Sequence, residues 1–429
     1  MTSSSERPVQ VRSVLSAGVG FLLIGITAMP AHADTAWDKQ WHLNSMHAEE
    51  MWETSTGSGV TVAVIDTGVD ESAADLRGQV LEGKDYSNLD GDEHTDHSGH
   101  GTKMASLIAA KSSRGKAVVA FGLAPGTKIL PIRMPAWTED YRKFNSRARF
   151  FEYMAKSIRF AADSDAKIIS ISMGQFNAPG KEMDAPPHLA AAAKYAINKG
   201  KLIFAAVGNQ GDKTNFLGYP AATPGVVGVG GVDQKARPVK NSQWGPQVDL
   251  AAPGGDVAGA CLRGKQICTG TGTSNAAALA SASAALLWSK HPDWTNNQVL
   301  RVLMTTASGN DKGLKRDDVV GYGVVRPRIA LKNPGNPGPA DEYPIPDLAA
   351  AAAAPKSPSP NASKSAGGSE KAAAKDNKQA AATTTSDAGD NNTLWIALGL
   401  GAAALIGTAI ALGVIRKIRR SSATEIPFE

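Results

Sequence analysis

Short apolar runs that alternate with helical stretches are the feature that most constrains the fold of this chain. Five runs rich in β-branched or small apolar residues predict buried strands: Val60–Ile65, Lys128–Ile132, Lys167–Ser172, Lys201–Val207 and Gly225–Val229. Four other stretches have the apolar spacing of helices: Phe150–Ser164, Pro187–Asn198, Asn275–Lys290 and Thr295–Thr305. Near-continuous apolar strands are typical of parallel sheets covered on both faces. The alternation therefore predicts an α/β fold, with a mostly parallel sheet and helices on both faces, over roughly Trp41–Ala330.

Polar residues follow two of these predicted strands. Asp66 ends the first strand, and Asn209 comes just after the strand Lys201–Val207. Ligands of such sheets bind at the carboxyl ends of the strands. A carboxylate at the end of a buried strand must also be hydrogen-bonded, because an unpaired one is costly. Taken by itself, the Asp-Thr-Gly at Asp66 is equally suited to an ordinary turn.

A histidine and a serine lie in similar small-residue turns further along the chain. His100 begins His-Gly-Thr, just before the predicted helix Lys103–Ala110. Ser274 lies in Gly-Thr-Ser-Asn-Ala and begins the helix Asn275–Lys290. Taken by itself, Ser274 is equally suited to be an ordinary helix N-cap. The segment is not the G-x-S-x-G elbow of α/β-hydrolases.

The chain order Asp66, His100, Ser274, in these turns, resembles the subtilisin-like serine proteases. The resemblance implies that these three residues are catalytic and that Asn209 and the Ser274 amide form the oxyanion hole. It also implies that Ser170–Gly174 is an edge strand that pairs with substrate, so that Ser172, Met173 and Gly174 bind substrate. Two positions depart from the family pattern: Lys103 stands where His is usual, and Ala278 where Pro is usual.

We expect neither a metal nor a cofactor. His94, His97 and His100 are spaced by three residues, but the stretch 92–101 reads as a loop, in which helical spacing carries no meaning. We therefore interpret His94 and His97 as solvent-facing loop residues. The two cysteines, Cys261 and Cys268, are expected to form one disulfide, the alternative being two free thiols.

The N-terminus predicts a secretory signal peptide. Arg7 and Arg12 precede an apolar run from Val14 to Met29, and Ala31-His32-Ala33 resembles a cleavage site. Residues 1–33 are assigned to this signal, with cleavage after Ala33. The alternative is an uncleaved N-terminal anchor. The peptidase domain, with an N-terminal extension, is assigned to residues 34–332.

The C-terminal part predicts a tether, one membrane span and a short tail. Residues 333–393 are rich in Ala, Pro and Ser and predict a disordered linker. The 22 residues 394–415 are apolar apart from one Thr, long enough to cross a bilayer. Basic residues follow at once in the tail 416–429. The sequence therefore predicts a protein of the cell membrane, with this tail in the cytoplasm and the catalytic domain on the extracytoplasmic side. A sorting-type tail and a buried core helix are the alternatives.

This architecture, together with the segment Trp37–Trp52, resembles the mycosins, membrane-anchored proteases of actinobacterial type VII secretion. The expected partners are a protein or peptide substrate, the membrane and the secretion membrane complex. Nucleic acid is not expected, because the net charge of +5 is small and no basic stripe with aromatics occurs. The expected function is a membrane-anchored serine endopeptidase. The alternatives are a structural component of the secretion complex, a general surface protease and a degenerate, inactive protease.

Overall fold

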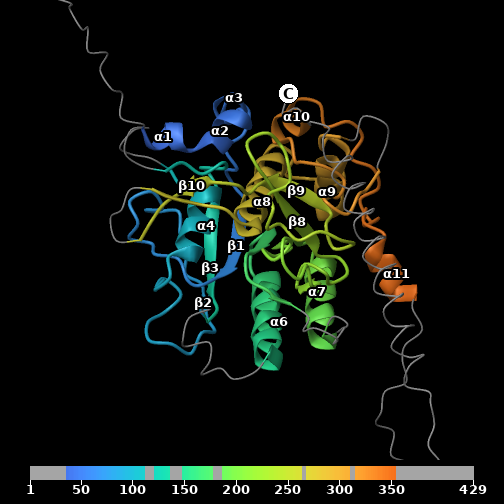
Figure 1. The fold of residues 1–429 in the computed structure, drawn as a ribbon, viewed down its shortest axis with the longest axis horizontal. Coiled ribbons are helices and arrows are strands. Elements are labelled where there is room, and N and C mark those ends of the chain that lie inside the picture. Colours follow the sequence, from blue (N-terminus) through green and yellow to red (C-terminus); the bar gives the residue numbers. More distant parts are fainter. Residues whose placement is uncertain are drawn as a thin grey trace, which may run out of the picture. The chain divides into compact units, whose positions relative to one another are not determined.

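The computed structural model describes residues 35–111, 120–135, 147–176, 186–262, 267–309 and 315–353 (Figure 1). Its helices are α1 (Ala36–Lys39), α2 (Trp41–Ser45), α3 (Ala48–Trp52), α4 (His100–Ala109), α6 (Arg147–Asp163), α7 (Pro187–Asn198), α8 (Thr273–Lys290), α9 (Asn296–Thr305), α10 (Pro327–Lys332) and α11 (Asp347–Ala353). Its strands are β1 (Thr61–Asp66), β2 (Lys84–Asp85), β3 (Lys128–Arg133), β4 (Ile168–Ile171), β5 (Gln175–Phe176), β6 (Leu202–Ala206), β7 (Gly218–Tyr219), β8 (Val227–Val232), β9 (Leu250–Pro253), β10 (Val257–Gly259) and β11 (Cys268–Gly270).

The central element is a parallel sheet, as the apolar runs predicted. Within the described ranges its seven strands lie in the order β2-β3-β1-β4-β6-β8-β9. The chain runs from β1 to β3 on one side and then crosses to β4 on the other side of β1. The strand order therefore reverses at β1, which is where open α/β sheets bind their ligands.

Both faces of the sheet are covered, which explains why its strands are apolar throughout. Successive residues of a strand point to opposite faces. Val62 and Val64 of β1 belong to the core formed with α4 and α8, whereas Ala63 and Ile65 belong to the core formed with α6 and α7. Figure 1 shows α6 and α7 side by side on one face of the sheet.

Some elements were not predicted from the sequence. The edge strand β9 reads Leu-Ala-Ala-Pro, which lacks β-branched residues and ends in proline, a residue confined to strand edges and ends. The strand β2 has only two residues, too few for a recognisable pattern.

The N-terminal segment Trp37–Trp52 packs against the rest of the folded domain. The rings of Trp37, Trp52 and Phe121 have centroids 5.6–6.0 Å apart. The Trp52 indole donates to the carbonyl of Leu123 at 2.9 Å, and the Gln40 amide exchanges two hydrogen bonds of 2.8 Å with the Phe121 backbone. This segment is therefore part of the folded domain.

Residues 333–353 differ from the predicted linker, because they pack on the domain. The Arg301 guanidinium donates to the carbonyls of Pro337, Pro339 and Glu342 at 2.8–3.1 Å. The Tyr343 hydroxyl donates to the Gly225 carbonyl at 2.7 Å. The composition of the segment did not reveal the Arg301 contacts, since backbone carbonyls accept these hydrogen bonds and every residue type has one.

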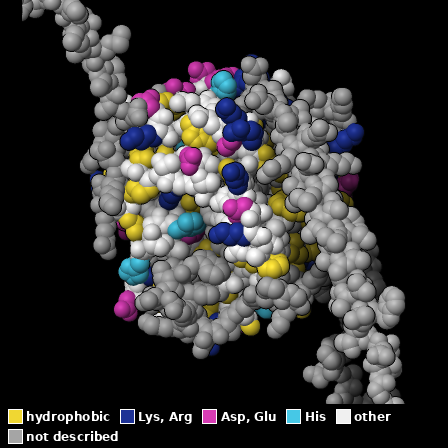
Figure 2. Space-filling model, in the orientation of Figure 1, with side chains coloured by type: hydrophobic (Ala, Val, Ile, Leu, Met, Phe, Trp, Pro, Cys, Tyr) yellow, Lys and Arg dark blue, Asp and Glu magenta, His cyan; other side chains and the backbone are white. Residues whose placement is uncertain are grey.

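The other terminal assignments lie outside the described residues. These are the signal peptide, the linker beyond residue 353, the span 394–415 and the basic tail. Within the described part of the chain, no helix has the length and hydrophobicity of a membrane span. On the face drawn in Figure 2, basic and acidic side chains are interspersed with small apolar areas.

The buried guanidinium of Arg133 holds the loop that follows β2. Its side chain is only 1% exposed and donates to the Asp85 carboxylate and to the carbonyls of Asp90 and Asp92 at 3.0–3.2 Å. Carboxylate and carbonyl oxygens are also the ligands of hard cations. The Arg133 guanidinium takes the place of such a cation and organises this loop, which leads to His100.

We predict that Arg133→Met destabilises the full-length protein by about 3–5 kcal/mol, because it removes the buried cation that pairs with the Asp85 carboxylate and binds the carbonyls of Asp90 and Asp92. Urea unfolding followed by tryptophan fluorescence measures the change. The control is Arg237→Met, which removes an exposed ion pair with Asp233 and should cost less than about 1 kcal/mol. Equal losses in the two variants would contradict the role assigned to Arg133.

Candidate active site

The predicted site residues come together at the carboxyl ends of the parallel strands. Asp66 ends β1, Ser172 follows β4 and Asn209 follows β6, and these three strands are neighbours. His100 is the first residue of α4, and Ser274 is the second residue of α8. The sequence placed His100 before its helix, but the helix includes it. The two helix starts therefore face the carboxyl ends of β1, β4 and β6.

Gly101 allows this close approach. A Cβ atom at this position would lie 2.1 Å from the Gly68 carbonyl oxygen and 3.1 Å from Cβ of Asp66. Any side chain would therefore push α4 away from the end of β1. The glycine of His-Gly-Thr is therefore required by packing.

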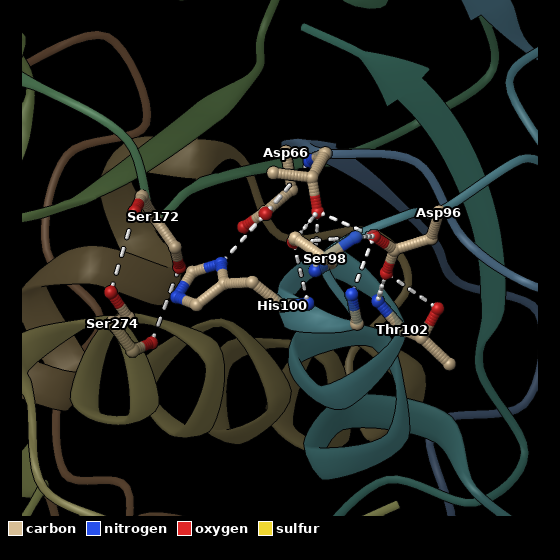
Figure 3. A network of polar contacts seen from close by, with 10 residues as sticks. Asp66, Asp96, Ser98, His100, Thr102, Ser172 and Ser274 are labelled. Atoms are coloured by element: carbon tan, nitrogen blue, oxygen red, sulfur yellow. Dashed lines mark hydrogen bonds and ion pairs between the residues drawn. The ribbon is translucent and has the colours of Figure 1, made fainter. Parts of the chain in front are cut away.

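A short hydrogen bond links Asp66 to His100. The imidazole Nδ1 lies 2.7 Å from Asp66 Oδ1, which also accepts from the Thr67 amide at 2.8 Å. The Asp66 side chain is 1% exposed, whereas that of His100 is 39% exposed. In Figure 3 the imidazole lies between Asp66 and the pair Ser172 and Ser274. Asp66 therefore fixes both the tautomer and the direction of the ring.

The pKa of His100 is raised above its ordinary value. Burial is the largest single influence and lowers the pKa, but the charge and hydrogen bond of Asp66, with the charge of Asp96, outweigh it. The nearby Lys103 acts in the opposite direction. The protonated ring is thus stabilised at the position where a proton acceptor is expected.

The Ser274 hydroxyl points to Ser172 rather than to His100. Its Oγ donates to the Ser172 carbonyl at 3.3 Å, and Ser172 Oγ donates back to the Ser274 carbonyl at 3.2 Å. Among the described residues, no hydrogen bond joins Ser274 to His100. Such bonds are often long or misaligned without substrate, so a turn of the hydroxyl is needed to complete the arrangement.

Asn209 and the start of α8 form a polar pair beside Ser274. Asn209 Oδ1 accepts from the Thr273 amide at 2.8 Å and from its hydroxyl at 3.1 Å, which fixes the orientation of the side-chain amide. Gly272 precedes α8 and provides no side-chain cap. The Thr273 amide donates to Asn209 and the Asn275 amide to the Gly272 carbonyl, so the Ser274 N–H between them remains suited to negative charge.

A cavity of about 260 Å³ opens next to Ser274. Its lining includes Ser172, Met173 and Gly174, as well as Asn209. The expectation of an edge strand at this position needs correction, because β4 lies between β1 and β6. Residues 172–174 instead leave the sheet beyond β4, where they border the cavity.

Asp96 is a site residue that the sequence analysis missed. Its buried carboxylate accepts hydrogen bonds of 2.7–3.3 Å from backbone and hydroxyl groups of Thr67, Ser98, Gly99 and Thr102. Thr67 follows Asp66, and the other three residues surround His100 (Figure 3). Asp96 therefore holds the two segments together. An acidic residue just before a helix start was the signal that could have identified it.

Lys103 lies one helical turn from His100, under the β10–β11 hairpin. Burial lowers the pKa of Lys103 to about 8. The neighbouring His42 is fully buried, and burial and the Lys103 charge lower its pKa to about 3. The predicted disulfide between Cys261 and Cys268 is confirmed, with Cα atoms 5.4 Å apart. It closes the hairpin over Lys103, since Cβ atoms at Gly259 and Gly270 would contact this side chain.

We predict that Asp96→Asn destabilises the protein by about 2–4 kcal/mol, because an NH₂ group replaces an acceptor of buried N–H and O–H donors. Chemical unfolding of the full-length protein checks this. In addition, NMR titration should give a lower pKa for His100, since the Asp96 charge raises it. Asp70→Asn is the control, because the Asp70 carboxylate accepts hydrogen bonds from the exposed Ser72 and from no other described residue. A stable Asp96→Asn protein with an unchanged His100 pKa would disprove this role.

We also predict that Lys103→Met raises the pKa of His100, because it removes a positive charge that opposes protonation of the ring. The pH at which His100 loses its proton should then move upward from the wild-type value, which itself lies above the ordinary histidine value. NMR titration of the His100 ring, assigned with a His100→Gln variant, measures both. Lys194→Met on the distant helix α7 serves as control, and a downward shift in Lys103→Met would refute the assignment.

Comparison with known proteins places this geometry in a family. The subtilase family matches residues 57–323. The chain is 33% identical to the thermophilic serine proteinase of Bacillus sp. (strain AK1), over 67% of each chain. It is 31% identical to Mycosin-1 of Mycobacterium tuberculosis (strain ATCC 25618 / H37Rv), over 71% of this chain and 75% of that protein.

Solved structures give the same result. The crystal structure of MycP1 from Mycobacterium smegmatis superposes with a TM-score of 0.62 at 28% identity, covering 73% of this chain and 89% of that one. A chain in the structure of an intact ESX-5 inner membrane complex gives a TM-score of 0.58 at 26% identity, covering 88% and 90%. This chain therefore belongs to the subtilase family of serine endopeptidases and is related to the mycosins.

Proposed function

We propose that this subtilase is a membrane-anchored, extracytoplasmic serine endopeptidase that works with a type VII secretion complex. The proposed peptidase activity rests mainly on the 2.7 Å contact between Asp66 and His100, with the imidazole directed toward Ser274. Asn209 and the start of α8 lie beside the same serine.

The proposed reaction uses Ser274 as nucleophile. His100 takes the proton of the Ser274 hydroxyl through Nε2 while the oxygen attacks a peptide carbonyl, and Asp66 stabilises the imidazolium that forms. The negative charge on the former carbonyl oxygen is held by Asn209 Nδ2 and the Ser274 amide. His100 then donates the proton to the leaving amine, and water hydrolyses the acyl-enzyme by the same steps.

The proposed substrate is an extended peptide that lies along residues 172–174. The backbone there has left the sheet, so its N–H and C=O groups can pair with a substrate strand. The substrate side chain next to the cut bond enters the 260 Å³ cavity beside Ser274. Met173, Phe176 and Tyr219 give this cavity apolar walls, while Gln210 and Lys213 add polar groups to its lining.

The proposed location and partner rest on two kinds of support. The sequence carries a signal-like N-terminus and an apolar stretch at 394–415 followed by basic residues. A similar chain occurs in the structure of an intact ESX-5 inner membrane complex, and the match extends over 88% of this chain. The same match supports a second candidate function, a structural role in the secretion complex.

We predict that a fluorophosphonate probe labels the full-length wild-type protein in detergent but not Ser274→Ala. Asn209→Ala should retain labelling and lose about 10²–10³-fold in kcat for a peptide substrate, the effect of removing one oxyanion donor in subtilisin. Asn336→Ala, outside the site, should match the wild type in both assays. Equal labelling of wild type and Ser274→Ala, or no labelling of folded protein, would remove the catalytic proposal.

A cellular assay separates the two candidate functions. Ser274→Ala is introduced in place of the wild-type gene, next to a full deletion, and the secreted proteins are compared. Uncleaved substrate in the Ser274→Ala strain supports a processing role. Full restoration of secretion and processing by Ser274→Ala, with failure in the deletion, supports the structural role instead.

A further inference from the structure

We infer that Glu82, Glu93 and His94 form a binding site for one divalent cation of the zinc class. The sequence analysis treated His94 as solvent-facing and expected no metal, but its side chain is only 15% exposed. The imidazole Nε2 lies 3.9 Å from Glu82 Oε2 and 3.9 Å from Glu93 Oε1. The three ligand atoms lie within 4.8 Å of one another.

The His94 ring is buried without satisfying either nitrogen. Both nitrogen atoms are inaccessible to solvent and make no hydrogen bond to any described residue. The separations of 3.9–4.0 Å to the surrounding carboxylates are too long for hydrogen bonds. A buried nitrogen without a partner is costly. A cation held between Nε2 and the two carboxylates, at about 2.0–2.2 Å from each, requires only a small contraction of the cluster.

The surroundings of the ring are those of a metal-bound histidine. Ligating histidines commonly direct their second ring nitrogen toward a carboxylate, which orients the ring. Here Glu71 Oε2 lies 4.0 Å from Nδ1 of His94. Glu93 Oε1 is already positioned by the Gly83 amide at 2.9 Å. The Glu82 side chain is 95% exposed, so it is free to close onto the cation.

The ligand chemistry indicates the class of metal. One imidazole nitrogen with two carboxylate oxygens suits Zn²⁺ and neighbouring transition ions, whereas Ca²⁺ and Mg²⁺ prefer oxygen ligands throughout. Water would complete the coordination of the ion. The site is distinct from the Asp66–His100–Ser274 centre and takes no part in the proposed peptide cleavage.

The bound cation would join three segments near the active site. Glu71 lies just after β1, Glu82 lies before β2, and Glu93 and His94 lie in the loop that leads to His100. The Glu93 carbonyl also accepts from the Val69 amide at 3.0 Å. The expected consequence is a metal-dependent rise in the thermal midpoint, because the ion binds only the folded arrangement.

The test measures metal binding to the full-length protein after removal of metals with a chelator. Co²⁺ should bind at one site with visible d–d absorption bands, and Zn²⁺ should displace it. Zn²⁺ affinity is measured by competition with a chromophoric chelator. His94→Ala and Glu93→Gln should weaken Zn²⁺ binding at least tenfold, and Glu71→Gln about 10–100-fold.

Two further variants test whether the loss of Zn²⁺ binding is specific to the proposed ligands. Glu82→Gln changes an almost fully exposed side chain and leaves folding intact, yet it should also weaken Zn²⁺ at least tenfold. His97→Ala alters an exposed histidine of the same loop and should leave affinity and thermal shift unchanged. The proposal is overturned if Co²⁺ and Zn²⁺ show no saturable binding, if Glu82→Gln and His94→Ala bind like the wild type, or if His97→Ala loses binding equally.

Discussion

The hydrogen bond between Asp66 and His100 is the contact on which the rest of the site depends. It joins residues 34 positions apart at a distance of 2.7 Å, and it requires the start of α4 to lie directly against the end of β1. A glycine at position 101 provides the space, and the Asp96 carboxylate ties both segments to each other. An error of about 1 Å in this arrangement would separate the ring from its partners.

Electrostatic contacts inside the preceding loop maintain this arrangement. Arg133 gathers the carboxylate of Asp85 and the carbonyls of Asp90 and Asp92 around a buried positive charge. A few residues later, Asp96 gathers N–H and hydroxyl donors around a buried negative charge. Both ions bind groups of the loop and of the elements beside it, so the loop has little freedom to adopt other conformations. The sheet supplies the fixed frame, and these two ions position His100 on it.

Much of the fold and site was predictable because it depends on local patterns. The apolar runs predicted the parallel sheet, and short motifs identified Asp66, His100, Ser274 and Asn209. Other features depend on contacts between distant segments. The role of Asp96 arises only when Thr67 and Thr102 meet, and the carboxylates of Glu71 and Glu82 come close to His94 only in the folded chain. The position of Asp96 before a helix start was a weak signal, and the sequence around His94 gives none.

The packed segment 333–353 fixes the side from which the rest of the chain departs. Its contacts lie at the amino ends of the strands, where Gly225 precedes β8 and Asp347 accepts from the Gly225 amide at 3.0 Å. Asp66, Ser172 and Asn209 lie at the opposite, carboxyl edge of the same sheet. A pull on the chain beyond Ala353 therefore acts on the back of the domain.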